Sequence, residues 1–161
     1  LKAAYQNFTE RWDFQLELML RPACVTTPRN TFTKRIRQLF TDAEKHYFGD
    51  KTLKYRRLAA LRVWRFVYVE KEGTDIHAHV LVNVPSQHTH NGVKLDVYEF
   101  NKFLCATWSS VSNPNNFTYG LHYYAQPSYN TDGNSYGAKE VLTTGNTDCW
   151  CEKASWVPKN N

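Results

Sequence analysis

The segment of residues 76–84 constrains the fold most, because every second side chain in it is apolar: Ile76, Ala78, Val80, Val82 and Val84. Successive side chains of a β-strand point to opposite faces, so this pattern predicts a strand with one face in a core. Residues 61–70 are rich in Val, Trp, Phe and Tyr and predict a second strand. Residues 71–75 between them include Gly73 and predict a tight loop. The two strands are therefore expected to form an antiparallel hairpin.

Further elements are expected on both sides of this hairpin. Residues 12–20 alternate like a half-buried strand, and apolar side chains repeat at helical spacing before Gly49 and again within residues 96–108. The remaining expectations are strands at residues 117–126 and 149–157, a short helix at residues 135–144, and a basic stretch at residues 51–57 that is a linker or the edge of the next element. Helices beside a central antiparallel sheet of about five strands define an α+β fold similar to ferredoxin-like and RNA-recognition folds.

The composition suits either a nucleic-acid partner or an ordinary solvated basic surface. The 161 residues suit one domain, residues 1–161, and the start at Leu1 rather than Met indicates a fragment or a processed form of a longer protein. The net charge is +5 and 15% of the residues are aromatic. Basic side chains neutralise phosphates, and aromatic rings stack on bases. The candidates for phosphate contacts are Arg35, Arg37, Lys54, Arg56 and Arg57. No apolar run is long enough to span a membrane, and no signal-peptide pattern is present.

His77 and His79 lie on the strand face opposite the apolar side chains. Their backbones are about 6.5–7 Å apart on such a strand, so the two imidazoles can hold one divalent cation. The third ligand is expected from Glu70 at the end of the preceding strand, or from Glu72 if that strand continues. Asp75 is expected in the turn. Two histidines and one carboxylate leave coordination positions open for substrate oxygens.

A tyrosine and a lysine lie three residues apart in the short helix expected at residues 135–144. At this spacing Tyr136 and Lys139 share one helix face. The pKa of a tyrosine phenol is ordinarily about 10, and a neighbouring ammonium group favours the phenolate and can also hold a phosphate. The pair therefore suits nucleophilic attack on phosphorus.

Together, these segments resemble the motifs of HUH-type Rep endonucleases, a family that includes the replication initiators of plasmids, phages and small circular DNA viruses. The resemblance rests on Phe14-Gln15-Leu16-Glu17-Leu18, His77-Ala78-His79 and Tyr136-Gly137-Ala138-Lys139, in that order. It spans nearly the whole chain, and it is more specific in the second and third motifs than in the first.

The resemblance implies an HUH endonuclease fold and a nicking activity on single-stranded or hairpin origin DNA. The implied ligands of Mg²⁺ or Mn²⁺ are His77, His79 and Glu70. The implied nucleophile, which would form a covalent 5′-phosphotyrosine, is Tyr136, with Lys139 as its helper. Such an initiator would work with a host polymerase and helicase, in the cytoplasm for a plasmid or phage and in the nucleus for a eukaryotic virus.

Some HUH relatives carry a second tyrosine four residues before the first. This chain has Asp132 there, so the resemblance implies a single-tyrosine enzyme.

Three alternative functions stay open at this point. A single-tyrosine HUH transposase would use the same chemistry. A non-catalytic binder of single-stranded nucleic acid would need no metal. A metal-dependent hydrolase would use water as the nucleophile in place of Tyr136.

Overall fold

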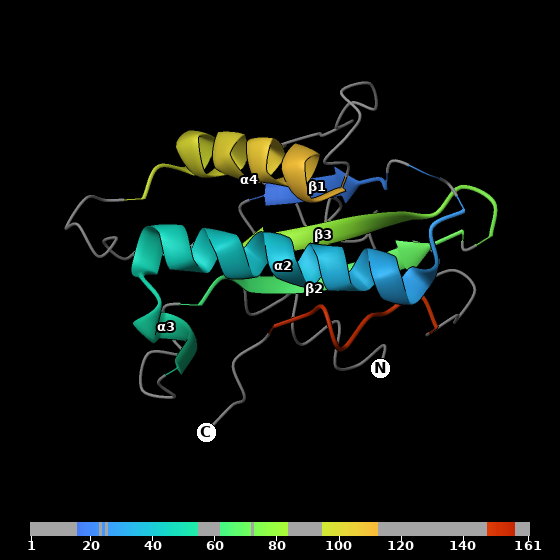
Figure 1. The fold of residues 1–161 in the computed structure, drawn as a ribbon, viewed down its shortest axis with the longest axis horizontal. Coiled ribbons are helices and arrows are strands. Elements are labelled where there is room, and N and C mark those ends of the chain that lie inside the picture. The colour runs from blue at the N-terminus through green and yellow to red at the C-terminus, as the bar shows by residue number, and fades with distance from the viewer. Residues whose placement is uncertain are drawn as a thin grey trace.

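The computed structural model of the chain describes residues 16–22, 24, 26–54, 62–71, 73–83, 95–112 and 148–156 (Figure 1). Within them the fold is α+β: a three-stranded antiparallel sheet of order β1-β3-β2, with two long helices against it. The bounds are β1 Leu16–Leu20, α2 Arg29–Phe48, α3 Lys51–Lys54, β2 Trp64–Glu70, β3 His77–Asn83 and α4 Val97–Ser112. No helix in this described part is long and apolar enough to cross a membrane.

Most of the expected elements within these residues are confirmed, and the differences concern residues 51–54, the end of the second helix and the C-terminal segment. Residues 51–54 form the short helix α3 where a linker or the edge of the next element was expected. The second expected helix runs to Ser112, beyond the expected end at residue 108. The expected elements at residues 117–126 and 135–144 lie outside the described residues, as does the first part of the 12–20 strand.

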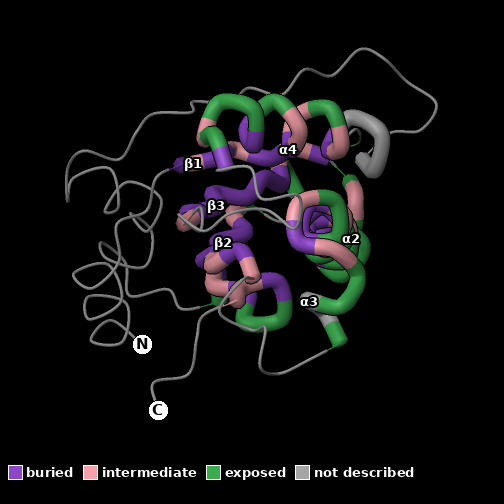
Figure 2. The backbone as a smooth tube through the Cα atoms, turned by 90° about the vertical axis from the view of Figure 1, so that its left-hand side faces the viewer, coloured by how far each residue is buried: buried purple, intermediate pink, exposed green. Residues whose placement is uncertain are grey.

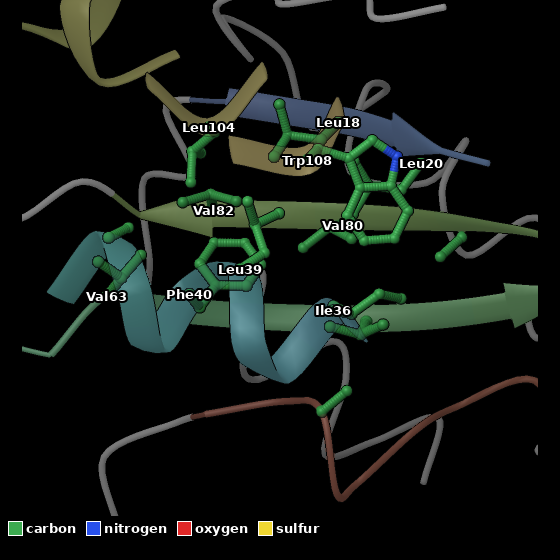
Figure 3. Close-up of a cluster of buried hydrophobic side chains, with 14 of the residues drawn as sticks. Leu18, Leu20, Ile36, Leu39, Phe40, Val63, Val80, Val82, Leu104 and Trp108 are labelled. Atoms are coloured by element: carbon green, nitrogen blue, oxygen red, sulfur yellow. The ribbon is translucent and has the colours of Figure 1, made fainter. Parts of the chain in front are cut away.

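The hydrophobic core lies between one face of the sheet and the two long helices. Each strand contributes every second side chain, and α2 and α4 contribute apolar stripes at helical spacing. In Figure 2 the sides of α2 and α4 turned toward the sheet are buried, whereas their outer sides are exposed. Each fully buried side chain of this kind contributes roughly 1.5–3 kcal/mol. The close-up of the core in Figure 3 labels Leu18, Leu20, Ile36, Leu39, Phe40, Val63, Val80, Val82, Leu104 and Trp108.

The hairpin loop fixes the register of β2 and β3. Lys71 and Gly73 adopt positive φ angles of 52° and 87°, and the backbone N–H of Asp75 donates to the Lys71 carbonyl at 3.1 Å. A positive φ is strained for most residues but not for glycine, so Gly73 can adopt the backbone conformation that this loop requires. The resulting register pairs Glu70 with His77.

Residues 148–156 run along the outer edge of β2, where a last strand was expected (Figure 1). Among the described residues they form two isolated antiparallel bridges, Arg65 with Trp156 and Tyr68 with Trp150. Between the bridges, Cys151 accepts backbone hydrogen bonds from Ala154 and Ser155, so a turn interrupts the ladder. The segment therefore covers the β2 edge without forming a regular strand.

A buried ionic network joins α2, β2 and this C-terminal segment. Glu44 on α2 is fully buried, and its Oε1 lies 3.1 Å from Arg65 Nη1 and accepts a hydrogen bond from the Val63 backbone N–H, also at 3.1 Å. Its other oxygen lies 3.1 Å from Nε of Arg62. Arg65 in turn donates to the Ala154 carbonyl at 2.9 Å. Burial lowers the pKa of Arg65 to about 10, which still leaves the guanidinium charged at neutral pH.

Candidate metal centre

Glu70, His77 and His79 converge on the sheet face that is turned away from the helices. Glu70 pairs directly with His77 across the hairpin, and His79 lies two residues farther along the same face of β3. Each of the three offers one ligand atom, and these atoms all lie within 4.8 Å of one another. The two imidazoles are buried, each 5% exposed, so the group is shielded from bulk water. The ligand set expected from the sequence is thus brought together.

The distances suit a cation between the three side chains. Glu70 Oε2 lies 3.5 Å from His77 Nε2 and 4.0 Å from His79 Nε2. Two metal–ligand bonds of about 2.1 Å that meet at a right angle place their ligand atoms about 3 Å apart, and wider angles give larger separations. Both distances to Glu70 lie within the roughly 4.2 Å that two such bonds can span, so the carboxylate can share one small divalent ion with either imidazole.

The opposite nitrogen of each imidazole faces an oxygen. His77 Nδ1 lies 2.8 Å from the Asp75 carbonyl oxygen, which can only accept, so Nδ1 carries the proton. His79 Nδ1 lies 3.4 Å from Glu17 Oε1 on β1. The hydrogen bond to the Asp75 carbonyl fixes the orientation of the His77 ring and makes its Nε2 a better ligand. The Nε2 atoms of both rings face Glu70.

The same contacts set the charges of the metal-free site. The hydrogen-bonding contact with Glu70 raises the pKa of His77 above its usual 6.5, although burial acts in the opposite direction. That contact lowers the pKa of Glu70 below its usual 4.5. Between about pH 4.5 and pH 6.5, the ordinary pKa values of the two groups, the charged pair contributes its full stabilisation to the metal-free fold. Its contribution is lost at lower pH as Glu70 is protonated, and at higher pH as His77 loses its proton. A cation must displace this proton, so metal affinity falls as the pH drops through the raised pKa of His77.

The other residues considered for the site either have another partner or lie outside the described residues. The Asp75 carboxylate forms an ion pair with Arg21, and its backbone oxygen contacts His77. Glu72, the alternative ligand, lies outside the described residues, as do Tyr136 and Lys139. Two neighbours of the triad, Glu17 and Arg21, were not expected from the sequence, although the alternation of residues 12–20 already placed Glu17 on the face opposite the leucines.

The basic side chains expected to contact phosphate lie away from the triad where they are described. Arg35 and Arg37 are on α2, which packs on the opposite face of the sheet, and Lys54 is on α3. Arg37 and Lys54 are exposed. Arg56 and Arg57 lie outside the described residues. A role for these side chains in DNA binding stays a prediction.

Comparison with known proteins gives no match: no protein-family model, no curated protein and no solved structure is similar to this chain.

Glu17 is expected to control metal affinity through His79. Replacing Glu17 with Gln removes the negative charge 3.4 Å from His79 Nδ1, and loss of such a contact typically weakens metal binding by about 10–100-fold. Calorimetric titration with Mn²⁺ measures this change. Glu99→Gln, at an exposed position on α4, is the charge-matched control and should bind as wild type does. An unchanged affinity in Glu17→Gln would show that His79 needs no support from β1.

Proposed function

We propose that this chain is the nicking domain of a rolling-circle replication initiator, a single-tyrosine HUH endonuclease with a central sheet of about five strands. The observation that carries the proposal is the Glu70–His77–His79 cluster, in which two histidines of one strand meet a carboxylate across a hairpin. The order of the sequence motifs, with Tyr136-Gly137-Ala138-Lys139 after the histidines, supports it.

We take Mg²⁺ or Mn²⁺ as the cofactor because the motif resemblance implies it. The ligand set itself, two imidazoles and a carboxylate, suits a divalent ion and would equally hold Zn²⁺ or Fe²⁺. When bound, the ion would neutralise charge on the scissile phosphate. The residues of this chain would hold it through Nε2 of His77 and His79 and a carboxylate oxygen of Glu70.

In the proposed reaction, the phenol oxygen of Tyr136 attacks the phosphorus of a single-stranded or hairpin origin DNA. The phenolic proton is lost, the bond from phosphorus to the leaving 3′ oxygen breaks, and that oxygen takes up a proton. The products are a 5′-phosphotyrosyl DNA and a free 3′-hydroxyl, which a host polymerase could extend after a helicase has opened the duplex. The ammonium of Lys139 would stabilise the phenolate and hold the phosphate.

A covalent-adduct assay tests this proposal. The protein is incubated with Mn²⁺ and a labelled single-stranded oligonucleotide library with a randomised centre, and adducts are separated on a denaturing gel. We expect an adduct that a chelator prevents, with mass spectrometry placing the nucleotide on Tyr136. Tyr136→Phe should form none, whereas Tyr98→Phe, at an exposed position on α4, should react as wild type does.

The other outcomes of this assay separate the alternative functions. Cleavage of the library without an adduct would indicate a hydrolase that uses water. Binding without cleavage would indicate a non-catalytic module. An adduct that persists in Tyr136→Phe would contradict the assigned nucleophile.

A further inference from the structure

We propose that Arg21 is a phosphate-binding residue of the candidate metal centre, placed to hold a backbone phosphate of single-stranded DNA beside the triad. This inference rests on the proposed function, because that function supplies the ligand. It adds a residue that lies outside all three sequence motifs.

The register of β1 and β3 places Arg21 at the site. Leu20 lies opposite Ala78. One step farther along the chain, the antiparallel register brings Arg21 level with His77. Because Leu20 points into the core and side chains alternate, Arg21 belongs to the face that carries His77 and Glu70. A guanidinium, an imidazole and a carboxylate therefore form one row across the end of the sheet.

Two neighbours hold Arg21 in this position. Its Nη1 group forms an ion pair with the carboxylate of Asp75. The indole Nε1 of Trp108 donates a hydrogen bond to the Arg21 carbonyl oxygen at 3.0 Å. The backbone oxygen of Asp75 also accepts the hydrogen bond from His77 Nδ1 at 2.8 Å. Asp75 thus joins the guanidinium to one of the metal-binding imidazoles.

A ligand can reach the guanidinium of Arg21 only from its exposed side, because its Nε is buried. The side chains of Arg21 and Asp75 are 36% and 40% exposed, so a ligand can reach them, and such a solvated pair adds little to stability. Arginine binds phosphate through pairs of planar N–H groups, and it stays charged. A phosphodiester attracted by the cation would meet this side chain next to it.

A binding experiment with two opposed variants tests the proposal. Fluorescence anisotropy measures the affinity of labelled oligothymidylate for the protein in Mn²⁺ at several salt concentrations. Arg21→Gln should weaken binding about tenfold or more, because a charge-assisted hydrogen bond is lost. It should also reduce the slope of log affinity against log salt by about 0.7, the value for one phosphate contact on a single strand. Asp75→Asn frees the guanidinium and removes a negative charge, so its affinity should equal or exceed that of wild type.

The controls separate a binding role from a structural one. Lys34→Gln removes one positive charge from the exposed surface of α2 and should change affinity much less than Arg21→Gln. Equal losses of affinity in Arg21→Gln and Asp75→Asn would show that the ion pair is structural. The proposal would also be overturned if Arg21→Gln bound oligothymidylate as tightly as wild type does, or if wild type did not bind it. If Arg21→Gln fails to fold, Arg21→Lys is compared with Asp75→Asn and must bind more weakly.

These results are distinguishable from a failure of the proposed function. Metal binding by wild type is measured without DNA, and the tyrosine adduct is measured separately. A protein that binds Mn²⁺ and forms the adduct, but whose DNA affinity is insensitive to Arg21→Gln, refutes the role of Arg21 alone.

Discussion

Replacing His77 with alanine is expected to abolish the binding of divalent cations. The substitution removes one of three ligand atoms and leaves Glu70 and His79, whose closest ligand atoms are 4.0 Å apart. Two ligands hold Mg²⁺ or Mn²⁺ far more weakly than three, since these ions already bind water strongly. The electron paramagnetic resonance signal of free Mn²⁺ measures binding, because the signal of the hexaaqua ion decreases as the ion binds to protein. The covalent adduct should be lost together with the metal.

The matched control for this variant is His46→Ala. His46 is an exposed histidine of α2, where its ring stacks on Phe103 away from the triad. Its removal should leave Mn²⁺ binding unchanged. Normal Mn²⁺ affinity in His77→Ala, or an equal loss in His46→Ala, would contradict the assignment of the ligands.

The largest expected effect on stability comes from Glu44→Ala. This variant leaves Arg65, which is 3% exposed, as a buried charge without its carboxylate partner. Breaking a buried ion pair on one side typically costs about 3–5 kcal/mol of unfolding free energy. The backbone N–H of Val63 also loses its acceptor. Urea denaturation measures the change through the midpoint of the transition.

Glu99→Ala is the control for the loss of an ion pair as such. Glu99 and Lys102 form an exposed pair on α4, and removing such a pair should change the unfolding free energy by less than about 1 kcal/mol. If Glu44→Ala were no less stable than Glu99→Ala, the network would not hold β2 against α2 and the C-terminal segment.

Local patterns in the sequence predicted the hairpin and the helices well. Alternation along β3 and the loop at Gly73 depend on neighbouring residues, so both could be inferred without the tertiary structure. The edge segment at residues 148–156 was harder, because its turn depends on hydrogen bonds to the Cys151 carbonyl that interrupt pairing with β2. The buried charge of Arg65 could not be predicted either, since its partner Glu44 lies on another element, 21 residues away.

At the site, too, features set by neighbouring residues could be predicted and features set by tertiary contacts could not. Glu70, His77 and His79 belong to one hairpin, so their convergence followed from the expected register. Glu17 and Arg21 reach the triad only because β1 pairs with β3 on the side away from β2. Strand order is a property of the whole fold, and no spacing in the sequence encodes it directly. The surroundings of the histidines therefore became visible only in the structure.

The most direct test of the central claim is a crystal of the protein soaked in Mn²⁺ and measured for anomalous scattering. We predict one strong peak bonded to Nε2 of His77, Nε2 of His79 and a carboxylate oxygen of Glu70. The absence of a peak between these three side chains, or coordination through Nδ1 with the rings turned over, would contradict it.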